Sequence, residues 1–287
     1  MTSAPESVII DRMRTLLTAS CLLASTVLGF TARAETPSAP ASVDPALAAA
    51  IASPARNPAF SARDSARHPA EELTFFGLKP TMTTVELWPG GGYWTEILGA
   101  YLAAQGHYYA ALPTPGDKDE DPGVARWRMR VAAQAGRLGT IHETELGNGS
   151  YSIAPPESAD LVLTFRNLHN WIGGGYADAA LAACFKALKP GGILGIEDHR
   201  GRADKPQDPK AKSGYVREDY AIALAKKAGF ELAGESQINA NPRDTKDWVD
   251  GVWTLPPTLS QGDKDRDRYL AIGEADNFVL KFRKPAR

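Results

Sequence analysis

The most informative segment is Val85-Glu86-Leu87-Trp88-Pro89-Gly90-Gly91-Gly92-Tyr93-Trp94, where a short apolar run meets a glycine-rich turn and then a helical pattern. The order of strand, tight loop and helix is typical of a loop that holds a ligand. Glycines let the backbone approach a bound group without an intervening Cβ, and the following helix directs free N–H groups at the loop. Glu86 is the one charged residue of this segment, and we expect it to accept hydrogen bonds at the rim of the loop.

Composition and charge limit the size of the domain and the classes of partner that we expect. The 287 residues are 43% hydrophobic, which is ample for the core of one large domain. The net charge is -2 and the isoelectric point is about 6.2, with no basic stripe. We therefore expect a small-molecule substrate, no nucleic-acid partner and no stable membrane span in the mature chain.

Residues 13–34 have the pattern of a secretory signal peptide. Met13-Arg14 supply a basic start, residues 16–30 form a short apolar run, and Ala32-Arg33-Ala34 is a small-x-small cleavage site. We predict a leader and signal peptide over residues 1–34, cleaved after Ala34, and a periplasmic or secreted protein. The protein is cytoplasmic if the signal is not used, and an uncleaved anchor or disordered leader is the alternative.

The rest of the chain divides into a linker and a folded domain. Residues 35–61 are rich in Ala, Pro and Ser, which predicts a disordered linker, and residues 62–287 are predicted to form the domain. Apolar strand patterns alternate there with helical ones. This alternation implies parallel pairing with right-handed crossovers, and hence an α/β three-layer sandwich.

In such a sheet, ligands bind outside the carboxyl ends of the strands, beside the point where the strand order reverses. Four segments are expected to meet there: the glycine loop, residues 112–121, residues 164–171 and residues 197–202.

Taken together, four segments resemble the class I S-adenosylmethionine-dependent methyltransferases, and within them the group whose first motif reads Glu-x-Trp-Pro-Gly-Gly-Gly. They are residues 85–92, 160–171, 188–199 and 225–231, and the similarity runs from about residue 63 to the C-terminus. The resemblance implies a mostly parallel, seven-stranded, Rossmann-like sheet. It also implies S-adenosylmethionine as cofactor and methyl transfer to an unidentified small-molecule acceptor.

The resemblance assigns cofactor-binding roles to the glycine loop. Glu86 corresponds to the acidic residue of the first motif, and Gly90 and Gly92 match its later glycines, beside the amino-acid end of the cofactor. Trp88 stands where the family usually has its first glycine. Its indole would therefore either form the base of the cofactor pocket or fill that pocket.

A second difference from the usual family pattern lies after the second predicted strand. Leu112 and Pro113 stand where the family usually places the carboxylate that binds the ribose hydroxyls, and Asp117 in the next loop is the one candidate substitute that the sequence suggests.

Methyl transfer requires a nucleophile held in line with the methyl group. Asn167 and His169 follow the fourth predicted strand, in a loop where a substrate would meet that group, and we predict both as catalytic residues. His169 would act as a general base. The alternative is that these side chains tie down the backbone of the loop.

The run Glu197-Asp198-His199 ends the fifth predicted strand and resembles a metal-binding cluster. Adjacent residues of a strand point to opposite faces, so we predict no metal site, and we keep Asp198 and His199 as secondary candidates on the substrate side. Trp248 and Trp253 lie in a long polar segment before the last strand, where they would shape a substrate pocket or pin the segment to the core.

Export and cofactor use conflict, because S-adenosylmethionine is a cytoplasmic metabolite. Three explanations would resolve this conflict. The signal peptide is not used, the cofactor is supplied outside the cytoplasm, or the protein is an exported small-molecule binding protein that reuses the fold without catalysis. A dinucleotide-dependent oxidoreductase is disfavoured, because Gly90-Gly91-Gly92 lacks the Gly-x-Gly-x-x-Gly spacing.

Overall fold

The structure is a computed structural model that describes residues 42–114, 121–147 and 149–286. The predicted signal peptide and its cleavage site lie outside these residues, as does Asp117. Among the described residues, no helix combines the length and the apolar composition that crossing a membrane requires.

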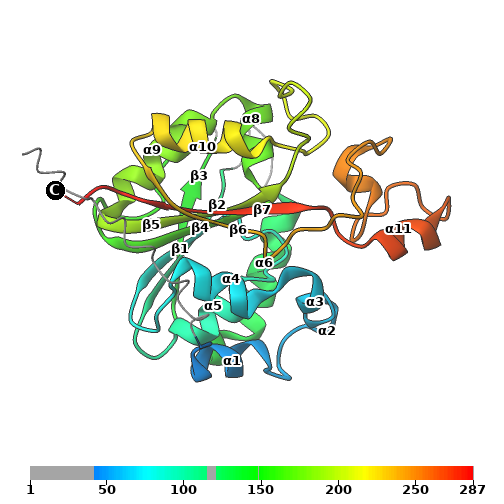
Figure 1. The fold of residues 1–287 in the computed structure, drawn as a ribbon. Coiled ribbons are helices and arrows are strands. Elements are labelled where there is room, and N and C mark those ends of the chain that lie inside the picture. Colours follow the sequence, from blue (N-terminus) through cyan, green and yellow to red (C-terminus); the bar gives the residue numbers. More distant parts are fainter. Residues whose placement is uncertain (1–41, 115–120, 148, 287) are drawn as a thin grey trace, which may run out of the picture. The chain divides into compact units, whose positions relative to one another are not determined.

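A seven-stranded sheet runs through the molecule in the order β3-β2-β1-β4-β5-β7-β6 (Figure 1). Its strands are β1 (Thr83–Leu87), β2 (His107–Pro113), β3 (Ile141–Leu146), β4 (Ala159–Phe165), β5 (Leu188–His199), β6 (Glu231–Ser236) and β7 (Asn277–Arg283). The order reverses between β1 and β4, and the carboxyl ends of these parallel neighbours lie at one edge. The predicted number of strands is confirmed.

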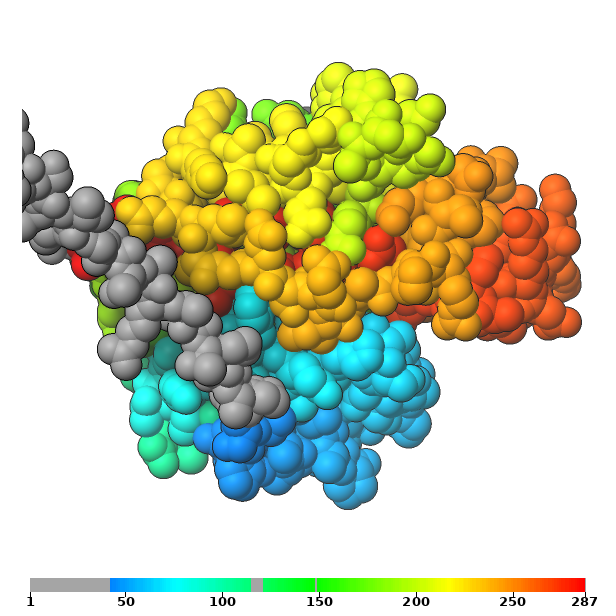
Figure 2. Space-filling view, viewed as in Figure 1, coloured from blue at the N-terminus to red at the C-terminus, as the bar shows by residue number. Residues whose placement is uncertain are grey.

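The prediction of a mostly parallel sheet is corrected, because the sheet is mixed. Strands β1 to β5 pair in parallel, whereas β7 runs antiparallel to both β5 and β6. The reason is that β6 ends and β7 begins at the same edge of the sheet. The connecting residues 237–276 stay beyond that edge as a lobe, drawn in orange in Figure 2, instead of crossing back over the sheet.

Helices cover both faces of the sheet (Figure 1). One face carries α8 (Leu168–Gly174), α9 (Ala177–Ala187) and α10 (Glu218–Lys227). The other carries α1 (Pro45–Ile51), α4 (Pro69–Phe76), α5 (Thr95–Leu102), α6 (Pro122–Ala133) and α7 (Ala135–Leu138). Short helices α2 (Pro58–Ser61) and α3 (Asp64–Arg67) precede α4, and the lobe holds the 3-10 helix η1 (Gly251–Thr254) and α11 (Arg266–Ile272).

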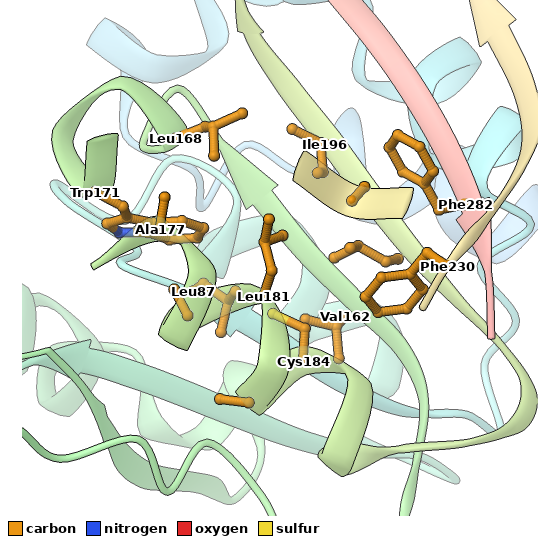
Figure 3. Close-up of a cluster of buried hydrophobic side chains, with 14 of the residues drawn as sticks. Leu87, Val162, Leu168, Trp171, Ala177, Leu181, Cys184, Ile196, Phe230 and Phe282 are labelled. Carbon is orange, nitrogen blue, oxygen red and sulfur yellow. The ribbon is translucent and has the colours of Figure 1, made fainter. Parts of the chain in front are cut away.

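The core beneath α9 is shown in Figure 3. Leu181 and Cys184, three residues apart on one helical face, lie with Val162 of β4 and with Phe230 and Phe282, all fully or almost fully buried. Cys184 is therefore a core residue, and burial raises the pKa of its thiol to about 12.

The predicted linker is corrected in its described part, residues 42–61, which forms α1 and α2. Asp44 caps α1 by accepting a 2.8 Å hydrogen bond from the N–H of Ala46, and proline begins the helix. Leu47 and Ala50, one helical turn apart, are buried in the same apolar cluster as Leu98 of α5. The folded domain therefore begins before residue 62.

Candidate functional site

The glycine loop joins β1 to α5 at the point where the strand order reverses. Trp88 has a φ of 51°, and its backbone N–H donates to the carbonyl of Ala111 at 2.8 Å, which continues the pairing with β2. Gly90 and Gly92 also have positive φ, 56° and 94°. The predicted order of strand, loop and helix is thus present.

The two glycines have different surroundings. A Cβ built on Gly90 would meet nothing within 4 Å, whereas one on Gly92 would lie 3.3 Å from Cδ1 of Trp127. Gly90 therefore faces open space, and Gly92 allows close packing against α6.

Glu86 lies beneath the loop instead of at its rim. Its side chain is buried, and Oε2 accepts hydrogen bonds from the hydroxyls of Thr95, at 2.9 Å, and of Tyr108. The indole N–H of Trp127 donates to Oγ1 of Thr95 at 3.0 Å. Burial raises the pKa of Glu86 to about 7, although the two hydroxyl donors oppose the rise. Glu86 therefore joins β1, β2, α5 and α6.

A cavity of about 240 Å³ opens beside the loop. It is lined by Trp88, Pro89, Gly90, Leu112, Pro113, Asp121, Gly123, Val124, Trp127 and Asn167. A second cavity of about 290 Å³ shares Leu112, Pro113, Asp121 and Val124 with it, so the two adjoin. Of the predicted cofactor residues, Trp88 and Gly90 line the first cavity, and Glu86 and Gly92 lie behind it.

Trp88 forms a wall of the cavity and does not fill it. Its indole N–H donates to the carbonyl of Leu146 at 2.8 Å, and its ring packs edge-on against Trp171, with centroids 6.3 Å apart. These contacts hold the ring against the α8 side and leave the space beside Gly90 open.

A carboxylate lies at the start of α6, next to the end of β2 in the lining of both cavities. Asp121 lines both cavities, and its Oδ1 caps the helix by accepting from the N–H of Gly123 at 2.6 Å. Its segment, residues 112–121, was expected at this edge of the sheet, but no role was predicted for Asp121 itself. Its signal was the Asp-Pro-Gly start of a helix directly after the loop that follows β2.

The segment after β4 is corrected from a loop to a helix, α8, with Asn167 at its N-cap position. Leu168, Trp171 and Ile172 are buried against the sheet, which is the periodicity of a helix. Arg166, just before it, has a φ of 61°. Asn167 donates from Nδ2 to the carbonyls of Leu87, at 3.1 Å, and Trp88, at 3.3 Å, so it ties the ends of β4 and β1 together.

His169 lies on α8 beside the end of β5. Its Nδ1 is 2.9 Å from Oδ1 of Asp198, and its backbone N–H donates to Oδ2 at 2.9 Å. The ring centroid of His199 lies 5.4 Å away, and Nδ1 of His199 is 2.7 Å from Oδ1 of Asn277. The structure therefore brings His169 together with both secondary candidates, two residues from the cavity-lining Asn167.

The charges of these groups follow from their burial. Burial alone would raise the pKa of Asp198, but attraction to His169 and its hydrogen bond lower it below the usual value. Burial lowers the pKa of His199 to about 3, so its imidazole is neutral at physiological pH.

Glu197 points away from this cluster, as its alternation with Asp198 along the strand predicts. Oε1 of Glu197 accepts from Nδ2 of Asn239 at 3.2 Å, and the same amide donates to Glu72 at 2.7 Å. Arg166 pairs with Glu274 at 2.6 Å and approaches Glu197 to 4.0 Å. Burial raises the pKa of Glu197 to about 7, and Arg166 opposes the rise.

The two tryptophans of the lobe differ in role. The indole N–H of Trp248 donates to Asp244 at 2.7 Å and pins the segment. Trp253 is 37% exposed, and its ring centroid lies 6.1 Å from that of His169 in an edge-on contact, so it packs against one side of the histidine.

Comparison with known proteins gives likeness of fold only. No family model and no curated protein matches the sequence. A methyltransferase from Aquifex aeolicus, described as dependent on S-adenosylmethionine, is 16% identical with a TM-score of 0.54, covering 79% of this chain and 94% of that chain. The 4+2-cyclase SpnF is 15% identical with a TM-score of 0.54, covering 77% of this chain and 81% of that chain. The protein therefore has the fold of class I methyltransferases.

Proposed function

We propose that the protein transfers a methyl group from S-adenosylmethionine to a small-molecule acceptor. The observation that carries this proposal is the cavity beside Gly90, at the switch point between β1 and β4. In sheets of this kind, ligands bind at that place.

The lining of the cavity fits the cofactor. A Cβ on Gly90 would project into open space, which is where a bound group can approach the backbone. Trp88 supplies an apolar wall, and Asp121 supplies a carboxylate for hydroxyl groups. Gly90, Trp88 and Asp121 would hold the cofactor, and Glu86 would act indirectly by fixing the loop from beneath.

When bound, the cofactor supplies an electrophilic methyl group. The residues of the protein contribute by positioning the cofactor and the acceptor. Asn167 fixes the edge of the cavity through its two hydrogen bonds to the end of β1 and the start of the loop. His169 stands on the acceptor side with its Nδ1 held by Asp198, and Trp253 limits the space around it. We propose that His169 contacts the acceptor, which extends the role predicted from the sequence.

The test is cofactor turnover by the full chain. Protein and S-adenosylmethionine are incubated with a small-molecule extract of cells, and S-adenosylhomocysteine is quantified by mass spectrometry. We expect it to accumulate only when wild-type protein and extract are both present, and not with Gly90→Val. Cofactor binding without any S-adenosylhomocysteine would instead support an exported binding protein that reuses the fold.

A further inference from the structure

Three side chains of the kinds that bind metal ions meet at the start of α8, close in the chain to Asn167, which lines the cavity beside Gly90. His169, Asp198 and His199 are all buried, and one ligand atom from each lies within 4.8 Å of the others. The sequence predicted no metal site here, because adjacent residues of a strand point to opposite faces. His199 is the last residue of β5, however, and α8 places His169 over that end of the strand, so the ring centroids of the two histidines lie 5.4 Å apart and Asp198 contacts His169. We propose that these three residues bind a divalent transition-metal ion.

The contact between His169 and Asp198 has nearly the spacing of two ligands on one ion. Nδ1 and Oδ1 are 2.9 Å apart. Two ligands each about 2.1 Å from a tetrahedral zinc ion lie about 3.4 Å apart. The ion would therefore replace the proton between these atoms after a shift of about half an ångström.

His199 is oriented to provide the third ligand. Its Nδ1 is 2.7 Å from Oδ1 of Asn277, and an amide oxygen only accepts, so Nδ1 carries the proton. The lone pair of Nε2 is then free to bind an ion. Metal-binding histidines are commonly held in this way by an oxygen at the other ring nitrogen.

The charges around the cluster permit a cation. Asp198 supplies a negative charge, and the nearby Arg166 is compensated by Glu274 at 2.6 Å and by Glu197 at 4.0 Å. Imidazole and carboxylate ligands suit zinc and other first-row divalent ions better than calcium, which prefers oxygen alone.

Three protein ligands leave a coordination position for water or for the acceptor. A hydroxyl or thiol bound there would have a lowered pKa and would release its proton to water. Its oxygen or sulfur would then form a bond to the methyl carbon while the bond from that carbon to the sulfonium sulfur breaks, and S-adenosylhomocysteine would leave. The proposed acceptor class is therefore a small hydroxyl or thiol compound. This step rests on the proposed methyl transfer, whereas binding of the ion does not.

The test uses the full chain, freed of metal by dialysis against a chelator. Zinc chloride is titrated by calorimetry, and cobalt chloride is followed by visible absorption. We expect one zinc ion per chain and affinity weakened at least about 10-fold in Asp198→Asn and His199→Gln. The matched control is His142→Gln, since His142 is an exposed histidine of β3 that stacks on Tyr109, and it should bind zinc as the wild type does.

Two results would overturn the proposal. One is zinc affinity in His199→Gln equal to that of the wild type; the other is a wild-type protein that neither binds zinc nor changes the spectrum of hydrated cobalt. The cobalt spectrum of the wild type decides the matter even if a variant does not fold. S-adenosylhomocysteine is titrated in parallel. A protein that binds this ligand but not zinc refutes the metal site alone. A protein that binds zinc but not this ligand refutes the cofactor site alone.

Discussion

The carboxyl group of Glu86 holds the glycine loop to the sheet beneath it. It takes hydrogen bonds from Thr95 at the start of α5 and from Tyr108 of β2, and Trp127 of α6 reaches the same threonine. A buried group with these partners fixes the position of the loop without touching a ligand, which separates the role of Glu86 from that of Gly90.

The raised pKa of Glu86 predicts a pH dependence of stability. The folded protein holds the proton up to about pH 7 and the unfolded chain only to about 4.5, so ionisation costs stability as the pH rises between these values. Glu86→Gln removes this cost. When the pH is raised from 5 to 8, the wild type should therefore lose about 2 kcal/mol of unfolding free energy relative to Glu86→Gln.

Urea unfolding of both proteins at the two pH values measures this difference. The comparison isolates Glu86, because the other buried carboxyls with raised pKa, Glu72 and Glu197, are present in both proteins. A difference that stays constant with pH would show that Glu86 titrates normally.

Gly90 tests the cavity itself. Gly90→Val should abolish the rise in thermal midpoint that S-adenosylhomocysteine produces in the wild type, because the new side chain projects into open space beside the cavity. The positive φ also strains the variant by about 1–2 kcal/mol, so its own thermal midpoint falls.

The matched control is Gly91→Ala. A Cβ at Gly91 would make an ordinary contact, 3.5 Å from Cζ of Phe60, and its φ is not positive. This variant should respond to the ligand as the wild type does, and an equal response from Gly90→Val would remove Gly90 from the site.

Residue types and spacing predicted which segments meet at the site, but not which of their side chains line the cavity. The loop around Gly90 was predictable because a turn with positive φ favours glycine. Glu86 was misplaced at the rim, since its burial depends on Thr95 and Tyr108, which come from other elements. The meeting of His169 with His199 depends on the packing of α8 against β5, which spacing does not encode.

Among the elements, α1 most clearly shows tertiary packing overriding composition. Its alanine-rich sequence predicts a linker, yet Asp44 caps the helix and Leu47 is 1% exposed against the cluster that contains α5. Two apolar residues one turn apart are too weak a pattern to predict a packed helix in isolation.

Leu47→Ala tests whether α1 belongs to the folded unit. The variant should lose about 2–5 kcal/mol of unfolding free energy, because a buried leucine leaves a cavity when truncated. The exposed Ala49→Ser in the same helix should change it by well under 1 kcal/mol. Denaturant unfolding of the full chain measures both, and equal stability of the two variants would mean that α1 contributes nothing to the fold.

The alternation of strands and helices was predictable from the apolar patterns. The direction of β7 was not, because an apolar strand reads the same in either direction. The helix α8 was missed because the polar Asn167, His169 and Asn170 concealed the buried Leu168, Trp171 and Ile172.

For the whole molecule, the sheet edge at the ends of β1, β4 and β5 carries the glycine loop, the histidine cluster and the lobe of residues 237–276. The fold alone does not name the reaction, since both a methyltransferase and a cyclase share it. The proposed function therefore depends on what the cavity binds.

Export is a further prediction for the whole chain. The pattern of residues 13–34 predicts cleavage after Ala34, so protein recovered from the cells that make it should begin at Glu35. Intact mass and N-terminal sequencing of that protein check this. A chain that keeps residues 13–34 in the soluble cytoplasmic fraction would contradict the predicted export.

Calorimetric titration of the full chain with S-adenosylmethionine tests the central claim most directly. We predict binding of one molecule per chain with a dissociation constant in the micromolar range, and a parallel stabilisation of about 2.7 kcal/mol when the ligand is present at 100 times that constant. A folded protein that shows no heat of binding and no stabilisation at millimolar ligand would contradict the claim that the cavity beside Gly90 is a cofactor site.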